Sequence, residues 1–178
     1  NGSADGSVDS LETSGLPAFT LLAEAENHGY AGGMNLGAAH ARGEWLVCLN
    51  PDAVADTSWL DQIAAGIARH PGTQVFTSAQ FDLADPRTLD GAGDAYLVFG
   101  IPWRGGFGRP ASELPGMGWC FSACGAAAMY DLALFRELGG FDERFFCYCE
   151  DVDLGFRLQL AGHDCLFVHD AIVHHAGS

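Results

Sequence analysis

An unbroken apolar run that ends in Asn-Pro-Asp constrains this chain more than any other feature. Residues Trp45–Leu49 are all apolar, and Asn50, Pro51 and Asp52 follow them directly. A short apolar run bounded by a turn signal predicts a strand buried on both faces, as in a parallel sheet. Pro51 cannot continue a central strand because it has no N–H group. The strand therefore ends there and leaves Asp52 at the carboxyl edge of an α/β sheet, where ligands bind.

Asp52 has two interpretations. A carboxylate at such an edge could hold a hard divalent cation against a phosphate group. Taken alone, however, an Asn-Pro-Asp turn more often serves only to reverse the chain. The choice depends on which other side chains the fold brings to the same edge.

Length and charge limit the function. The chain has 178 residues, 48% of them hydrophobic, which suits one globular α/β domain over residues 1–178. Its formal net charge is −15, with eight Arg and no Lys, which argues against nucleic acid or anionic lipid bound through a basic surface. No apolar stretch approaches the roughly 18 residues that span a membrane, and the start does not resemble a signal peptide. We expect a cytoplasmic location, with peripheral contact at the inner face of the membrane left open.

Six cysteines raise the question of disulfides or zinc. They are Cys48, Cys120, Cys124, Cys147, Cys149 and Cys165. Without a secretion signal, reduced thiols in the core are the better interpretation. Neither close pair has the Cys-x-x-Cys spacing of a zinc knuckle, so structural zinc is disfavoured.

The N-terminal part is rich in turn residues and glycine. Residues 1–7 read as a turn, and Ser7 or Asp9 could cap a short helix over residues 8–14. Residues 27–37 contain four glycines, which predicts a loop whose backbone can approach a ligand, followed by a helix over residues 36–42. A plain flexible loop is the alternative.

The middle of the chain predicts a helix, strands and a long loop. The helix runs from a cap at Asp56 or Thr57 to Arg69, and strands are expected over residues 75–79 and 96–99. The helix would bury a stripe of four residues, Leu60, Ile63, Ala64 and Ile67. Residues 100–118 lack periodicity and read as a lid, an acceptor loop or only a solvated loop, with Arg104 or Arg109 available to a phosphate.

Two adjacent carboxylates follow an aromatic stretch near the C-terminal end. Glu150 and Asp151 begin a predicted helix that extends to about residue 161. Asp151 could simply cap that helix, which needs only one carboxylate. Two carboxylates in an apolar aromatic setting instead favour a general base, because burial and like charge raise one pKa. Strands are expected over residues 165–168 and 171–173, and the histidine pair after them is a candidate metal ligand.

Together these stretches resemble family 2 of the glycosyltransferases, the inverting enzymes of the GT-A fold, and in particular their bacterial rhamnosyltransferase-like branch. The matching pieces occur in the family's order and cover almost the whole chain: residues 1–7, 29–35, 49–52, 124–127, 139–143 and 150–154, and His174. The resemblance implies an α/β fold with a mixed, mostly parallel central sheet flanked by helices. It also implies that the family's first strand and helix lie before residue 1.

The resemblance further implies a function and a set of site residues. It predicts transfer of a sugar, rhamnose being one candidate, from a nucleotide-diphospho-sugar to a hydroxyl of a saccharide or lipid-linked acceptor. It assigns Asp151 as the base with Glu150 beside it, and Mg²⁺ or Mn²⁺ held by Asp52 and His174. The donor would contact Gly32, Gly33, Asn35, Asn50, Asp52, Gly125 and Ala126.

This chain departs from the family pattern at the metal motif. Asn50-Pro51-Asp52 supplies one carboxylate where an Asp-x-Asp motif supplies two, which predicts weaker metal binding. The alternative function is a non-catalytic GT-A-like module that binds a nucleotide sugar or a partner domain. A nucleotidyltransferase is disfavoured because it would need a basic phosphate loop, and the chain has no Lys.

Overall fold

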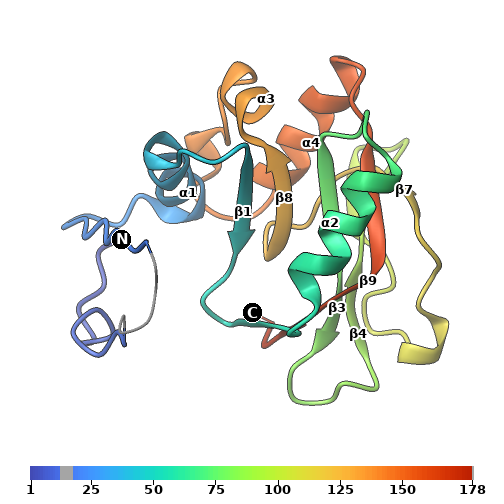
Figure 1. The fold of residues 1–178 in the computed structure, drawn as a ribbon, viewed down its shortest axis with the longest axis horizontal. Coiled ribbons are helices and arrows are strands. Elements are labelled where there is room, and N and C mark those ends of the chain that lie inside the picture. The colour runs from blue at the N-terminus through green and yellow to red at the C-terminus, as the bar shows by residue number, and fades with distance from the viewer. Residues whose placement is uncertain (13–17, 178) are drawn as a thin grey trace.

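The computed structural model describes residues 1–12 and 18–177, which form an α/β fold (Figure 1). The helices are α1 (Gly29–His40), α2 (Trp59–Arg69), α3 (Leu132–Glu137) and α4 (Glu150–Leu160), with 3₁₀ turns η1 (Ala111–Glu113) and η2 (Glu143–Phe145). The central sheet contains β1 (Trp45–Leu49), β2 (Ala53–Ala55), β3 (Val75–Asp82), β4 (Leu89–Ala92), β7 (Gly118–Cys120), β8 (Ala127–Asp131) and β9 (Cys165–His175). A separate hairpin joins β5 (Asp94–Leu97) to β6 (Ile101–Arg104).

The sheet is mixed, as predicted, but it is not mostly parallel. Its strand order is β1-β8-β3-β9-β2, with β4 also paired to β3 and β7 to β9. Among the pairings of the described residues, only β3 with β9 is parallel. The reason is that β8 runs between β1 and β3 in the reverse direction, which makes both of its pairings antiparallel.

Helices cover both faces of the sheet. On one face, α2 packs through Trp59 and Ile63 against a cluster that includes Phe76 and Val168. On the other face, α1, α3 and α4 share a second cluster, in which Leu154 of α4 is fully buried. Aromatic rings of β8, α3 and the segment before α4 meet there at centroid distances of 5.2–6.1 Å. This two-sided packing fixes the start of α4 relative to the sheet edge.

Two predicted burial patterns are wrong. Strand β1 buries Leu46 and Cys48 but exposes 40% of Val47 and 38% of Leu49. Successive side chains of a strand point to opposite faces, and only the face that carries Leu46 and Cys48 packs into the core. Helix α2 buries Trp59 and Ile63, whereas Leu60 is 54% exposed. The helix begins at Trp59, whose indole N–H donates to Ser78 Oγ at 2.8 Å. Its buried stripe consists of Trp59, Ile63 and Gly66, so the predicted Leu60 and Ala64 are exposed.

The predicted glycine loop is a helix. Residues 29–40 form α1, and its first residue, Gly29, has φ +69°. A Cβ atom on Gly29 would lie 2.2 Å from the carbonyl oxygen of Phe146, so only glycine allows this approach. The N–H of Ala31 donates to the same carbonyl at 3.2 Å. Gly29 therefore allows close packing of α1 against the segment before α4.

Three smaller expectations also need comment. Of the helix expected over residues 8–14, the last two residues lie outside the described part, and residues 7–10 form a turn. The strand expected over 96–99 is instead β5 followed by a turn. All six cysteines are free thiols, but Cys147 and Cys149 are exposed rather than in the core. In the described ranges, no helix has both the length and the apolar character needed to cross a bilayer.

Candidate functional site

A pocket of about 250 Å³ lies where the start of α4 meets the ends of β1 and β9 and the base of the β5–β6 hairpin. Its walls come from segments far apart in the sequence. Residues of the lining include Tyr30, Asn50, Asp94, Trp103, Arg104, Gly125, Ala126, Cys147, Cys149, Glu150, Asp151 and His175. The predicted donor-binding and catalytic residues Asn50, Gly125, Ala126, Glu150 and Asp151 therefore lie in this lining, together with Arg104, one of the two arginines predicted to be available to a phosphate.

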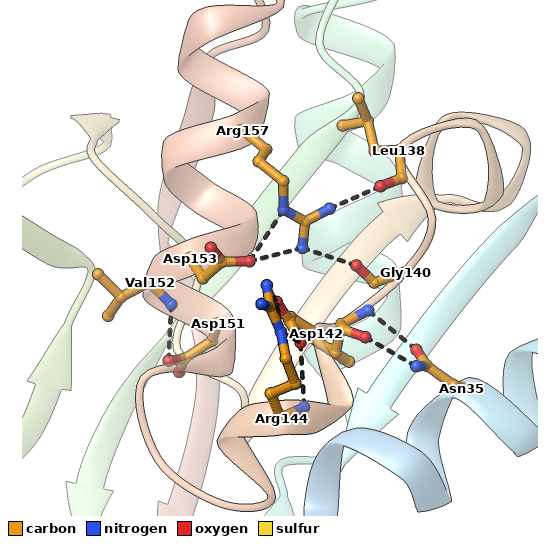
Figure 2. A network of polar contacts seen from close by, with 10 residues as sticks. Asn35, Leu138, Gly140, Asp142, Arg144, Asp151, Val152, Asp153 and Arg157 are labelled. Atoms are coloured by element: carbon orange, nitrogen blue, oxygen red, sulfur yellow. Dashed lines mark hydrogen bonds and ion pairs between the residues drawn. The ribbon is translucent and has the colours of Figure 1, made fainter.

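Asp151 is held by two backbone N–H groups. Its Oδ2 accepts from the N–H of Gly125 at 2.8 Å. Its Oδ1 accepts from the N–H of Val152 at 2.8 Å, the contact drawn in Figure 2. The helix α4 begins one residue earlier, and its N-cap position is Cys149, which makes no side-chain cap bond. Asp151 is thus not the N-cap, and its carboxylate is oriented by the loop at Gly125 as well as by its own helix.

The loop at Gly125 is itself fixed. The hydroxyl of Tyr30 donates to the carbonyl oxygen of Gly125 at 2.6 Å. A Cβ atom on Gly125 would lie 2.9 Å from that hydroxyl oxygen, so a larger residue would push Tyr30 away. Next along the chain, the carbonyl oxygen of Ala126 accepts from the N–H of Asn50 at 3.0 Å. These contacts tie the end of β1 to the carboxylate of Asp151.

The segment that leads into α4 has a strained backbone. Phe146, Tyr148 and Cys149 have φ of 61°, 70° and 69°, in the left-handed region that non-glycine residues rarely adopt. Such conformations cost on the order of 1–3 kcal/mol each and occur mainly at functional sites. The surrounding contacts must therefore hold this segment in place.

Asn35 and Arg157 hold residues 138–143, the loop that precedes this segment (Figure 2). The side chain of Asn35 accepts from the N–H of Phe141 at 2.9 Å and donates to its carbonyl at 2.8 Å. The guanidinium of Arg157 pairs with Asp153 and donates to the carbonyl oxygens of Leu138 and Gly140. Asn35 is therefore committed to the loop and does not line the pocket.

The two predicted donor glycines also lie outside the pocket. Gly32 faces His28 and the carboxyl group of Glu143, and Gly33 faces the side chain of Asn1. Both belong to α1 rather than to a ligand-facing loop. The structure therefore does not bring Gly32, Gly33 and Asn35 together with Asp151.

Two buried carboxyl groups accompany Asp151. Burial raises the pKa of Glu150 to about 7, and the charge of Asp151 adds to this effect. Burial likewise raises the pKa of Asp94 to about 7, again with a contribution from Asp151. Oε2 of Glu150 has no hydrogen-bond partner among the described residues, whereas Asp94 accepts a long 3.4 Å bond from the hydroxyl of Ser122. We call Asp94, Glu150 and Asp151 the α4 cluster.

A second group of polar residues centres on His175. Its Nδ1 lies 2.8 Å from Oδ2 of Asp90, and its Nε2 lies 3.4 Å from Oδ1 of Asp52. Arg104 donates to the same Asp90 carboxylate at 3.1 and 3.2 Å. His175 and Asp90 are both buried. We call Asp52, Asp90, Arg104 and His175 the histidine cluster.

His174, the predicted metal ligand, lies elsewhere. Its Nε2 is 3.4 Å from Oδ1 of Asp56, and its ring contacts Phe81. Adjacent residues of a strand point to opposite faces, so only one histidine of the pair can face Asp52. Arg109, the other predicted phosphate contact, pairs with Glu113 on the surface.

The histidine cluster fits a divalent cation. With Nδ1–H donating to Asp90, Nε2 presents a lone pair, and it has no hydrogen-bond partner in the described part of the chain. Its 3.4 Å spacing from Asp52 suits two neighbouring ligands of one ion, since ligand bonds to such metals are about 2.0–2.2 Å long. The described residues contain no cluster of three or more potential ligands, so further ligands would come from substrate and water.

Sequence reasoning did not identify Asp90 and Asp94 as site residues, and from the candidate pair of histidines it assigned His174 rather than His175 to the metal. Asp94 stands alone between Gly93 and a run of apolar residues, a weak signal that a charged group is held inside. Strand alternation offered a stronger signal for the histidines, because it required a choice between His174 and His175.

Comparison with known proteins gives matches in sequence. A family model described as glycosyl transferase family 2 matches residues 1–139. The chain is 31% identical over 207 aligned residues to the N-acetylglucosaminyl-diphospho-decaprenol L-rhamnosyltransferase of Mycobacterium tuberculosis, covering 98% of this chain and 64% of that protein. It is 32% identical over 136 residues to the O-antigen biosynthesis protein RfbC of Myxococcus xanthus, covering 72% of this chain and 10% of that protein. The chain thus spans less than two thirds of the length of these relatives.

Solved structures share the fold. The chain resembles GalNAc-T7, crystallised with UDP, GalNAc and Mn²⁺, with a TM-score of 0.65 and 17% identity over 83% of this chain and 30% of that one. It also resembles the mannosyltransferase PcManGT from Pyrobaculum calidifontis, in complex with GDP-Man and Mn²⁺, with a TM-score of 0.61 and 20% identity over 89% and 39%. These likenesses confirm the predicted GT-A type of α/β fold.

Proposed function

Because the chain belongs to glycosyltransferase family 2, we propose that it transfers a sugar from a nucleotide-diphospho-sugar to a hydroxyl group of a saccharide or lipid-linked acceptor. One observation carries the proposal. A single pocket contains the carboxylate of Asp151, oriented by two backbone N–H groups, and the imidazole of His175, whose Nε2 faces Asp52. This arrangement supports the proposal because it places a proton acceptor in the same pocket as an imidazole that could bind a metal together with the adjacent Asp52.

The reaction is a direct displacement at the anomeric carbon of the donor sugar. The acceptor oxygen forms a bond to that carbon while the bond from the carbon to the diphosphate oxygen breaks. The nucleoside diphosphate leaves with the electron pair, and the hydroxyl proton passes to the carboxylate of Asp151. One such displacement inverts the anomeric configuration. The hydrogen bonds from Gly125 and Val152 keep the base in one orientation as the acceptor approaches.

A divalent cation fits this function. Asp52 and His175 would hold Mg²⁺ or Mn²⁺, and the histidine nitrogen favours Mn²⁺. The bound ion would offset the negative charge that develops on the departing diphosphate. His175 replaces His174 in this proposal because His174 lies beside Asp56. Asn50, whose Oδ1 is buried without a partner among the described residues, would hydrogen-bond the donor together with the backbone at Gly125 and Ala126.

The relatives support rhamnose as the sugar and a lipid-linked acceptor. The Mycobacterium tuberculosis relative is named for rhamnosyl transfer to a diphospho-decaprenol acceptor, and the Myxococcus xanthus relative for O-antigen biosynthesis. We therefore propose a role in cell-surface polysaccharide synthesis at the cytoplasmic face of a membrane. A screen of UDP-, dTDP- and GDP-sugars would identify the nucleotide of the donor.

The test is the substitution Asp151→Asn. It removes the proton acceptor but keeps the size of the side chain, so we expect transfer to fall by about 10²–10⁴-fold, the usual contribution of a general base. Donor binding, measured by the donor-induced rise in melting temperature with UDP-, dTDP- and GDP-sugars, should stay within about threefold.

The matched control is Asp131→Asn. Asp131 also accepts a backbone N–H at a helix start, from Leu134 at 2.8 Å, but it lies outside the pocket. This control should keep transfer activity. Transfer that survives Asp151→Asn would refute the assignment of the base. Donor binding by the parent chain without any transfer would favour the alternative function, a non-catalytic nucleotide-sugar-binding module.

A further inference from the structure

The β5–β6 hairpin carries an apolar face that the core does not use. Opposite residues of an antiparallel pair share a face, and the pairs Ala95–Trp103 and Leu97–Ile101 form the outer one. Leu97, Ile101 and Trp103 are 45%, 52% and 57% exposed. One face of an antiparallel sheet is normally polar where it meets water. This hairpin is apolar there.

The inner face of the hairpin explains its position but not its outer composition. Tyr96 stacks on Phe121 at 5.0 Å and meets Phe156 of α4 at 5.4 Å. Arg104, the partner of Asp94 in the register, reaches Asp90 in the histidine cluster. The hairpin is therefore anchored through this side, and its outer side chains contribute little to folding.

Among the large apolar residues that the structure describes, the two at the tip of the hairpin are the most exposed. Val98 is 94% exposed and Phe99 is 84% exposed. Gly100, with φ +83°, closes the turn through an N–H bond to the carbonyl of Leu97 at 2.9 Å. The turn is thus defined, and it presents two apolar side chains outward.

The whole hairpin face is also uncharged. Residues 95–103 contain no Asp, Glu, Lys or Arg, although the chain has 31 such residues, 8 basic and 23 acidic. A contiguous exposed apolar surface marks an interaction site. Trp103 of this outer face belongs to the lining of the pocket that holds Asp151, so the apolar face is continuous with the proposed active site.

We propose that the outer face and tip of the β5–β6 hairpin insert into the interface of a lipid bilayer and bring the pocket to an acceptor carried by that bilayer. The inference rests on the proposed function only for the acceptor. Aromatic and aliphatic side chains at a projecting tip are the groups that enter a membrane interface. The net charge of −15 disfavours attraction to anionic headgroups, so apolar insertion is the driving force.

The experiment measures co-sedimentation of the 178-residue chain with phosphatidylcholine vesicles that contain no acceptor. The parent chain should bind, and the double substitution Val98→Asp with Phe99→Asp should weaken binding by about tenfold or more. Phosphatidylglycerol in the vesicles should weaken binding of the parent chain. Circular dichroism should show an unchanged fold, because both positions are exposed in a turn.

The control variant is Leu60→Asp. Leu60 is also exposed and apolar, but α2 packs on the face of the sheet opposite α4, so this change should leave vesicle binding intact. The inference would be overturned if the parent chain failed to bind acceptor-free vesicles, if binding required anionic lipid, or if Phe99 proved to mediate only self-association in solution.

The two proposals can fail separately. Vesicle binding requires neither donor nor base, so Asp151→Asn should bind vesicles like the parent chain. Transfer to a short water-soluble acceptor without vesicle binding would overturn the membrane inference alone. Vesicle binding without transfer would contradict the proposed function alone.

Discussion

The two polar clusters of the pocket are built on different principles. The α4 cluster gathers three carboxyl groups with no described cation paired to Asp94, Glu150 or Asp151, and burial raises the pKa of two of them to about 7. The histidine cluster alternates basic and acidic groups, from Arg104 through Asp90 and His175 to Asp52. The α4 cluster suits carboxyl groups that gain and lose a proton near neutral pH. The histidine cluster suits a bound metal cation, whose charge does not change with pH.

The largest effect on metal binding should come from removing the imidazole of the histidine cluster. We expect His175→Ala to weaken Mn²⁺ binding by about 100-fold or more, because it removes the residue that we propose as a direct ligand rather than an outer partner. The ion-dependent rise in melting temperature in the presence of a nucleotide sugar measures this loss.

His174→Ala is the matched control, since His174 is the adjacent residue but faces Asp56. It should retain the ion-dependent shift. The variant Asp90→Asn should fall between the two, with a loss of about 10–100-fold, because Asp90 only orients the imidazole. A loss with His174→Ala equal to that with His175→Ala would place the metal on the wrong face of β9.

Strand β9, which carries both histidines, shows what could and could not be predicted from the sequence. The presence of Asp151 and Gly125 in one pocket followed only from the family resemblance. Apolar runs and carboxylate positions were sufficient to predict α4 and the turn at Asn50–Asp52. They were insufficient to choose between His174 and His175, because that choice depends on the register of β9 against β2 and β3. Register is a property of pairing and not of one strand alone.

The prediction of a loop for the glycine-rich segment was wrong for a different reason. Four glycines within residues 29–37 lower helix propensity, so a loop was the natural prediction. Tertiary contact overrode that preference, since Gly29 lets α1 meet the carbonyl of Phe146 at a distance that no side chain permits. Asn35 was likewise taken for a donor contact, although its three hydrogen bonds hold residues 141–143. Glycine and asparagine in a family motif can thus support a site without touching the ligand.

A second, smaller effect tests whether burial destabilises the charged form of the carboxyl groups in the α4 cluster. The pKa of Asp94 is about 7 in the folded chain and ordinary in the unfolded chain. The folded chain therefore binds the extra proton between about pH 4 and pH 7, and stability falls as pH rises through that range. We expect Asp94→Asn to match the parent at pH 4 and to exceed its unfolding free energy by about 1–3 kcal/mol at pH 8.

Melting curves across this pH range provide the measurement, and each kcal/mol should raise the melting temperature by about 2–4 °C in a chain of this size. Asp61→Asn is the control, because Asp61 is exposed on α2 and its removal should change stability by less than about 0.5 kcal/mol at either pH. If Asp94→Asn destabilised the chain equally at pH 4 and pH 8, the carboxyl group of Asp94 would act as a hydrogen-bond acceptor that stabilises the fold. It would then not be a buried group whose charged form destabilises the chain.

The smallest effect concerns donor binding and separates the two clusters most directly. The pKa of Glu150 is also about 7, so its side chain gains negative charge as pH rises from 6 to 8. A diphosphate donor in the same pocket is repelled by that charge, and we expect its affinity to fall severalfold over this range. Glu150→Gln should flatten the dependence, whereas Glu113→Gln, which changes an exposed partner of Arg109, should preserve it. Isothermal titration with the nucleotide sugar in the presence of Mn²⁺ makes the comparison. If His175→Ala flattened the pH dependence of donor affinity and Glu150→Gln did not, the charge that changes with pH would lie in the histidine cluster. The roles proposed for the two clusters would then be reversed.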